Sequence, residues 1–135
     1  MTGRGAILID RLAPALFSAD GSGGGAPLGA AVLTHPDGTQ SVTPLNQPVP
    51  FGQAGDVVTL VLYATGMRGV DSQDHVAIYV GSTRLPVLYA GPQPAYTALD
   101  QINVTLPSTL HGAGPLALRT VVEGLSSNTV TVTLN

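Results

Sequence analysis

The chain has 135 residues, of which 44% are apolar and 10% charged; it contains no cysteine and no lysine, and its net charge is −3. This length and composition predict one packed domain and not a disordered one, and the absence of cysteine excludes a disulfide framework and a thiolate metal site. The five arginines do not cluster, so nucleic acid is not an expected partner, and no apolar run approaches the roughly 18 residues that a membrane-spanning helix requires.

The first strand candidate is residues 6–12, AILIDRL, in which Ile7 and Ile9 are apolar. This apolar run is short and is interrupted by an Asp-Arg pair, which does not fit a secretory signal peptide. The chain is therefore expected to be either cytosolic or cut from a longer secreted precursor, and residues 1–12 to be a linker or a first strand. Residues 13–135 then form the domain itself.

The next segments predict a loop and a hairpin. Residues 18–28, SADGSGGGAPL, have the composition of a flexible loop, and Phe17 just before them is expected in the core. A strand over 29–33 is followed by an Asp-Gly turn, and a strand over 40–43 pairs back onto it.

Residues 44–56 hold three prolines and no periodicity, which predicts a loop over one end of the domain with Phe51 as its anchor. The segment that follows, VVTLVLYAT, has apolar residues in both of its alternating sets of positions. This pattern predicts a central strand that is covered on both faces.

The rest of the chain alternates apolar and polar residues in short runs. Residues 75–81 and 101–106 each predict a strand, the second with its aliphatic side chains inward. Residues 87–106 together indicate a strand, a proline-rich crossing loop and a second strand. The segments 115–122 and 128–134 predict a final hairpin.

About eight or nine short strands are therefore expected, with turn signals between them and no helical period of any length. This is the pattern of an all-β protein, and it favours an antiparallel β-sandwich or a barrel.

Three short segments carry a resemblance to a known family: YATG at 63–66, YAG at 89–91 and QIN at 101–103. With their spacing, they make the chain from about Ala13 to Asn135 similar to the immunoglobulin-like C-terminal domain of large secreted acidobacterial proteins. That domain is related to the IPT/TIG type of Ig-like fold. The chain departs from the family pattern at Ala15, which replaces a glycine, and at a Gly-Ser turn that replaces a glycine pair.

The resemblance implies an Ig-like antiparallel β-sandwich at the end of a secreted or cell-surface protein. It implies an extracellular or cell-surface location, and it carries no enzymatic residue over to this chain.

No motif places a catalytic or nucleotide-binding site. The GSGGGA run at 21–26 nominally matches a dinucleotide fingerprint, but neither a strand nor a helix flanks it as that motif requires. His35, His75 and His111 lie too far apart for metal-ligand spacing, and we expect each to be an exposed turn residue. We therefore predict no catalytic residue and no enzyme.

Calcium is the one metal worth weighing, and Asp71 and Asp74 are weak candidates for holding it in a loop. A calcium site needs six or more oxygen ligands, and the EF-hand pattern is absent. The alternative is that these aspartates cap turns, and no other cofactor is expected.

Tyr89 and Tyr96 are the best candidates for a sugar-binding surface, although packing at the edge of the core is the alternative for both. Gln101 and Asn103 flank a strand residue, and we expect their amides to hydrogen-bond the connection at 91–99.

The sequence thus leaves two functions open. The first is a non-enzymatic structural or interaction module that docks on neighbouring domains or other protein subunits. Its variant is self-association by strand exchange, with Ile7 and Ile9 on the exchanged strand. The second is a carbohydrate-binding module at Tyr89 and Tyr96, assisted or not by calcium.

Overall fold

Two antiparallel sheets form the structure, a computed structural model that describes residues 14–66 and 76–135, with the backbone alone for 96–98. The first sheet has the order β3-β2-β4-β8-β7, and β1 also pairs with β4. Its strands are β1 (Ala15–Leu16), β2 (Gly29–Thr34), β3 (Gln40–Pro44), β4 (Val57–Thr65), β7 (Val87–Gln93) and β8 (Tyr96–Leu106).

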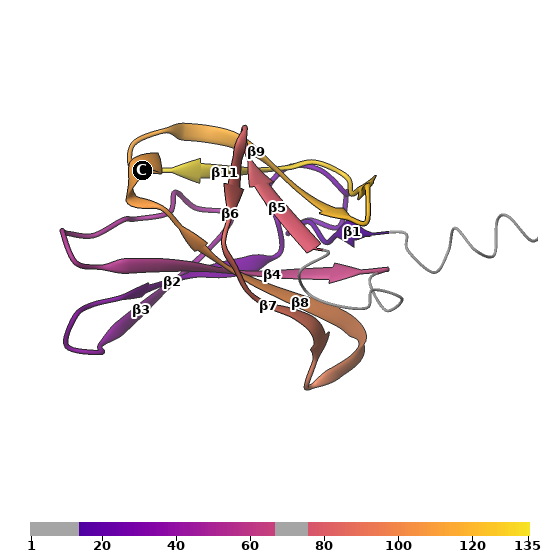
Figure 1. The fold of residues 1–135 in the computed structure, drawn as a ribbon, viewed down its shortest axis with the longest axis horizontal. Helices are drawn as coiled ribbons and strands as arrows, with labels where there is room; N and C mark the ends of the chain where they lie inside the picture. The colour runs from indigo at the N-terminus through magenta and orange to yellow at the C-terminus, as the bar shows by residue number, and fades with distance from the viewer. Residues whose placement is uncertain (1–13, 67–75) are drawn as a thin grey trace, which may run out of the picture.

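The second sheet has β9 at its centre, with β5 and β6 on one side and β10 and β11 on the other. Its strands are β5 (Val76–Val80), β6 (Thr83–Leu85), β9 (Gly114–Val122), β10 (Leu125–Ser126) and β11 (Val130–Leu134). Figure 1 shows this sheet in the upper part of the view and the first sheet below it. A short 3-10 helix, η2 (Ser108–Leu110), connects β8 to β9.

The strand order confirms the predicted Ig-like antiparallel sandwich. In that fold, strands A, B, E and D of one sheet pack on C, F and G of the other. Here β2, β4, β8 and β7 take the first four places, and β5, β9 and β11 take the other three, with β6 added beside β5. The described strands number eleven instead of eight or nine because β1, β6 and β10 are only two or three residues long.

Alternating aliphatic side chains of both sheets form one buried cluster between the layers. Leu60 and Leu62 of β4 and Ile102 and Val104 of β8 are fully buried, as the period of two predicts. Burying each side chain of this size contributes about 1.5–3 kcal/mol. The final hairpin is also confirmed, since β11 pairs with β9 and turns its Val130, Val132 and Leu134 inward.

The expected burial of Phe17 is wrong, because its side chain remains 38% exposed. Neighbouring side chains on an extended chain point to opposite sides, and the preceding residue, Leu16, is the one that faces the core. Phe51, in contrast, is buried and anchors the loop 44–56 as expected.

The prediction that β4 is covered on both faces is also wrong. The strand is central, between β2 and β8, but only one of its faces meets the core. On the other face Val57 is 48% exposed, and Val61 and Tyr63 are half-buried, because no described layer covers that side.

Residues 87–106 form a hairpin and not two strands joined by a crossing loop. Strands β7 and β8 are hydrogen-bonded neighbours, and Gln93 pairs with Tyr96 across a two-residue turn of Pro94 and Ala95. Proline fixes its own φ at about −65°, the value at the first central position of a type I or type II turn. The change of sheet occurs earlier, at Pro86, which stands between β6 and β7.

Two loops cover the outer edge of β11. The Thr131 N–H donates to the Gly25 carbonyl at 2.7 Å, so the glycine-rich loop lies beside this strand. Further along, the Val49 N–H donates to Thr133 O at 2.8 Å, and the Asn135 N–H donates to Val49 O at 3.0 Å. These bonds satisfy backbone groups that an open edge strand would present to other chains.

Asn128 joins β1 to the last hairpin through its side-chain amide. The Leu16 N–H donates to Asn128 Oδ1 at 2.8 Å, and Asn128 Nδ2 donates to Leu16 O at 3.0 Å and to Gly23 O at 2.8 Å. The amide therefore replaces the strand neighbour that β1 lacks on this side, and it ties together segments 112 residues apart.

Replacing Asn128 by alanine should lower the free energy of unfolding by about 1–3 kcal/mol, because two partly buried backbone groups of Leu16 and the exposed Gly23 carbonyl lose their partner. Urea denaturation measures the change. Thr129→Ala, at the exposed neighbouring position, should stay within about 0.5 kcal/mol of the wild type. Equal effects of the two substitutions would contradict the role given to the amide.

Candidate functional site

The outer face of the first sheet carries no charged side chain in the part of the chain that the structure describes. Its five main strands contain one charged residue, Asp100, and that side chain is 1% exposed. A protein surface normally mixes both signs of charge, so a sheet face without either is unusual for a surface in contact with water.

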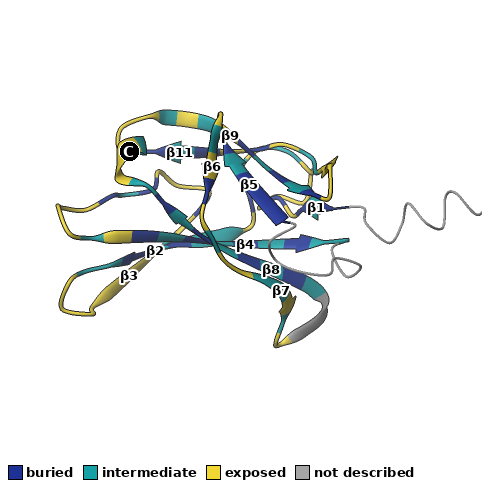
Figure 2. Ribbon diagram, in the orientation of Figure 1, coloured by how far each residue is buried: buried dark blue, intermediate teal, exposed yellow. Residues whose placement is uncertain are grey.

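One half of this face, over β3, β2 and the start of β4, carries aliphatic side chains together with the polar Gln40, Thr34 and Thr59. Cross-strand pairing places Val42 opposite Val32, and Ala30 opposite Val61, all on the side away from the core. Val42 is 65% exposed and Val57 is 48% exposed. Figure 2 shows β3 exposed along most of its length. We call this surface the valine patch; its members are Ala30, Val32, Val42, Val57 and Val61.

The other half of the face, over β4, β8 and β7, is polar and aromatic. Asn103 stands opposite Tyr89, and Gln101 stands between Tyr63 and Gly91. The Gln101 Nε2 donates to Asn103 Oδ1 at 3.0 Å, and the Tyr89 hydroxyl donates to Pro92 O at 2.7 Å. We call this surface the tyrosine–amide patch; its members are Tyr63, Tyr89, Gly91, Gln101 and Asn103.

The amides were expected to fix the connection at 91–99, and this prediction is not met by the side chains that the structure describes. Gln101 and Asn103 bond each other, whereas a two-residue turn holds the connection. Their free polar atoms consequently face the solvent side of the sheet.

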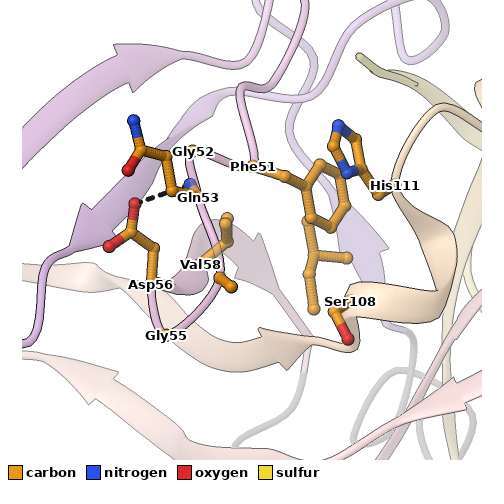
Figure 3. A pocket seen from close by; sticks show the side chains of 10 residues that line it. Phe51, Gly52, Gln53, Gly55, Asp56, Val58, Ser108 and His111 are labelled. Carbon is orange, nitrogen blue, oxygen red and sulfur yellow. Dashed lines mark hydrogen bonds between the residues drawn. The ribbon is translucent and has the colours of Figure 1, made fainter.

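A cavity of about 460 Å³ lies at one end of the sandwich. Its walls are the loop 51–56, the end of β8 and the residues around η2 (Figure 3). The Phe51 ring stacks on the His111 imidazole with centroids 5.2 Å apart. Ser108 and His111 both line the cavity, but no side-chain hydrogen bond joins them as a nucleophile and its base would require.

Asp56 closes the loop beside this cavity. Its Oδ2 accepts a hydrogen bond from the Gln53 N–H at 2.9 Å, and its Oδ1 lies 3.0 Å from His35 Nδ1 (the first contact is dashed in Figure 3). The Gln53 N–H and then the His35 ring hold the pKa of the Asp56 carboxyl below its ordinary value. His35, expected to be an exposed turn residue, has a side chain that is 41% exposed and that is also partnered by Asp56.

The opposite face of the sandwich carries the two arginines that the structure describes. Arg84 of β6 and Arg119 of β9 each stand opposite Tyr79 of β5. The Arg119 guanidinium lies 4.8 Å from the centre of the Tyr79 ring, a cation–π distance. The two sheets thus differ in the charge of their outer faces.

The structure brings together few of the residues predicted for a site. Ile7, Ile9, Asp71, Asp74 and His75 lie outside the described residues. Tyr89 lies on the edge strand β7 and is 36% exposed, whereas Tyr96 begins β8 and its side chain is not described.

The GSGGGA run is a loop between two strands, β1 and β2, and it is not followed by the helix that a nucleotide site requires. The Ser18 hydroxyl accepts from the Gly23 N–H at 2.8 Å and donates to Asp20 Oδ1 at 3.2 Å. Within the described ranges there is no group of three His, Cys, Asp or Glu side chains that could hold a metal ion.

Sequence reasoning missed the uncharged sheet face and the role of Tyr63 in it. A signal was present: the segments 29–34, 40–44, 57–65 and 87–106 contain one charged residue between them. Recognising the surface also required the register, because only pairing places Tyr63, Gln101 and Tyr89 on one side of one sheet.

Comparison with protein-family models, with curated proteins and with solved structures finds no match for this chain. The described residues contain no helix with the length and apolar character needed to cross a membrane.

The Asp56 carboxylate should stabilise the fold in a pH-dependent way. Because its pKa is lower in the folded than in the unfolded chain, its contribution is complete above the ordinary value of 3.8 and is lost as the pH falls through the folded-state pKa. Asp56→Asn should therefore unfold at a lower urea concentration than the wild type at pH 7, and the difference should shrink at pH 3. If the two proteins differ in unfolding midpoint by the same amount at pH 7 and at pH 3, the carboxylate does not have this role.

Gly52→Ala should destabilise the loop more than Gly55→Ala. Both glycines have positive φ, +70° and +94°, so each alanine carries a backbone cost of about 1–2 kcal/mol. At Gly52 the added Cβ would also collide with the Asp56 carboxylate, whereas at Gly55 it would meet only Pro36 Cγ at 3.3 Å. Thermal denaturation of the two variants measures the difference, and equal melting temperatures would contradict it.

Proposed function

We propose that this protein is a non-enzymatic interaction module of an extracellular or cell-surface protein, and that it docks on another protein through the valine patch. The observation that carries the proposal is the exposure of Val42 and Val57 on a sheet face without charged side chains. Exposed apolar side chains gathered on one face are typical of sites of protein–protein contact.

The partner that this surface favours is an equally uncharged protein surface. A second copy of the chain supplies one, because two valine patches facing each other bring no like charges together although each chain has a net charge of −3. A neighbouring domain or another subunit with an apolar sheet face would meet the same requirement.

The extracellular setting rests on the resemblance to the Ig-like C-terminal domains of secreted proteins. The strand order is compatible with it, and a sandwich without cysteine can fold in either an oxidising or a reducing compartment.

Strand exchange is a variant of the same function. Among the described strands β3 is an edge strand, paired with β2 and no other, and it carries the exposed Val42. Residues 6–12 of a second copy, with Ile7 and Ile9, would add to this edge by backbone hydrogen bonds.

Light scattering on the isolated chain tests the proposal. We expect the mass to rise with concentration, and we expect Val42→Glu and Val57→Glu each to weaken association at least about tenfold, since each buries an unpaired charge in the contact. Ala117→Glu places the same charge at an exposed position on the other sheet and should leave association unchanged.

Deletion of residues 1–12 separates the two modes of contact. Association through the valine patch survives the deletion, whereas association by strand exchange is lost. A wild-type chain that remains monomeric at millimolar concentration would refute self-association in both forms.

A further inference from the structure

We propose that the tyrosine–amide patch binds a neutral oligosaccharide, with one sugar ring stacked on Tyr89 and sugar hydroxyls hydrogen-bonded to Gln101 and Asn103. This site is distinct from the valine patch and does not depend on the docking function proposed there. Glycan binding and protein docking would use different halves of the same sheet face.

Tyr89 forms a platform that is fixed before any ligand arrives. Its ring extends along β7 over Gly91, where an added Cβ would lie 3.0 Å from the phenol oxygen and 3.3 Å from Cζ. The hydroxyl is held by its bond to Pro92 O at 2.7 Å. Because Gly91 has no side chain, the ring can lie against the strand, and a flat apolar surface with a fixed orientation results.

The amides beside the platform offer both kinds of hydrogen-bonding group. The bond from Gln101 Nε2 to Asn103 Oδ1 fixes the two side chains relative to each other. This bond leaves Asn103 Nδ2 as a donor and Gln101 Oε1 as an acceptor. Among the described residues, every buried side-chain polar atom has a partner, so these two unpartnered atoms are not buried. They lie next to Tyr89, which stands opposite Asn103.

The chemistry of the patch selects a neutral, polyhydroxylated ligand. A sugar ring has an apolar face that packs on an aromatic ring and hydroxyls that both donate and accept. An acidic glycan would need a cation, and the two described arginines lie on the other sheet, beside Tyr79.

The width of the patch suits a chain of sugars more than a single one. Tyr63 is on β4 and Tyr89 on β7, with β8 between them, so the two tyrosines stand about 10 Å apart across the sheet. That span is comparable to two linked pyranose rings lying across β8.

A nuclear magnetic resonance titration tests the site. The probes are cellohexaose, xylohexaose, mannohexaose and maltohexaose, each with and without calcium, and oligogalacturonate as the acidic comparison. We expect at least one neutral probe to shift the side-chain amide signals of Gln101 and Asn103. Tyr89→Ala and Asn103→Ala should each weaken that binding about tenfold.

Two further variants make the outcome specific. Tyr79→Ala removes a tyrosine from the outer face of the other sheet and should leave the affinity unchanged. Gly91→Ala forces the Tyr89 ring from its place and should weaken binding while the melting temperature stays close to that of the wild type. Tyr89→Ala should leave self-association through the valine patch unchanged, so the two proposals fail separately.

The proposal is overturned if none of the neutral probes shifts these amide signals at millimolar concentration. It is also overturned if Tyr79→Ala weakens binding as much as Tyr89→Ala, or if oligogalacturonate binds more tightly than every neutral probe.

Discussion

Two sheets can share a dry core only if every strand between them turns alternate side chains inward, and this constraint organises the whole protein. Leu60 and Leu62 of β4 meet the same buried cluster as Ile78 of β5 and Val132 of β11. Once those residues face inward, the residues between them face outward, and the register determines which of these lie side by side. The composition of the outer faces follows from positions that the core does not use.

The two outer faces present different kinds of side chain. One presents valines, tyrosines and amides, and the other presents Arg84 and Arg119 beside Tyr79. A sheet face that another protein covers can lack charged side chains. Charged side chains on a face in contact with water increase the solubility of the protein. The asymmetry therefore gives the sandwich a polarity, with one side suited to contact and the other to solvent.

The fold could be predicted from the sequence further than the site could. Period-two patterns such as that of Ile102 and Val104 identify strands and their inward residues directly, because burial acts on each strand separately. The same patterns do not identify which strands pair with each other. The proline-rich segment after Tyr89, for example, is equally compatible with a crossing loop and a tight turn. The tyrosine–amide patch combines β4, β7 and β8, so it exists only after pairing is known.

The amide of Asn128 has a consequence for the order in which the molecule is completed. The strand β1 receives this partner from the far end of the chain, across 112 residues. During synthesis Leu16 and Gly23 emerge long before Asn128, so they wait for its amide until the last hairpin of the domain has been made. Closing so long a loop is slow and entropically costly. Until then the start of the domain has its pairing with β4 and the backbone bonds across the glycine-rich loop, and the amide of the last hairpin completes its partners.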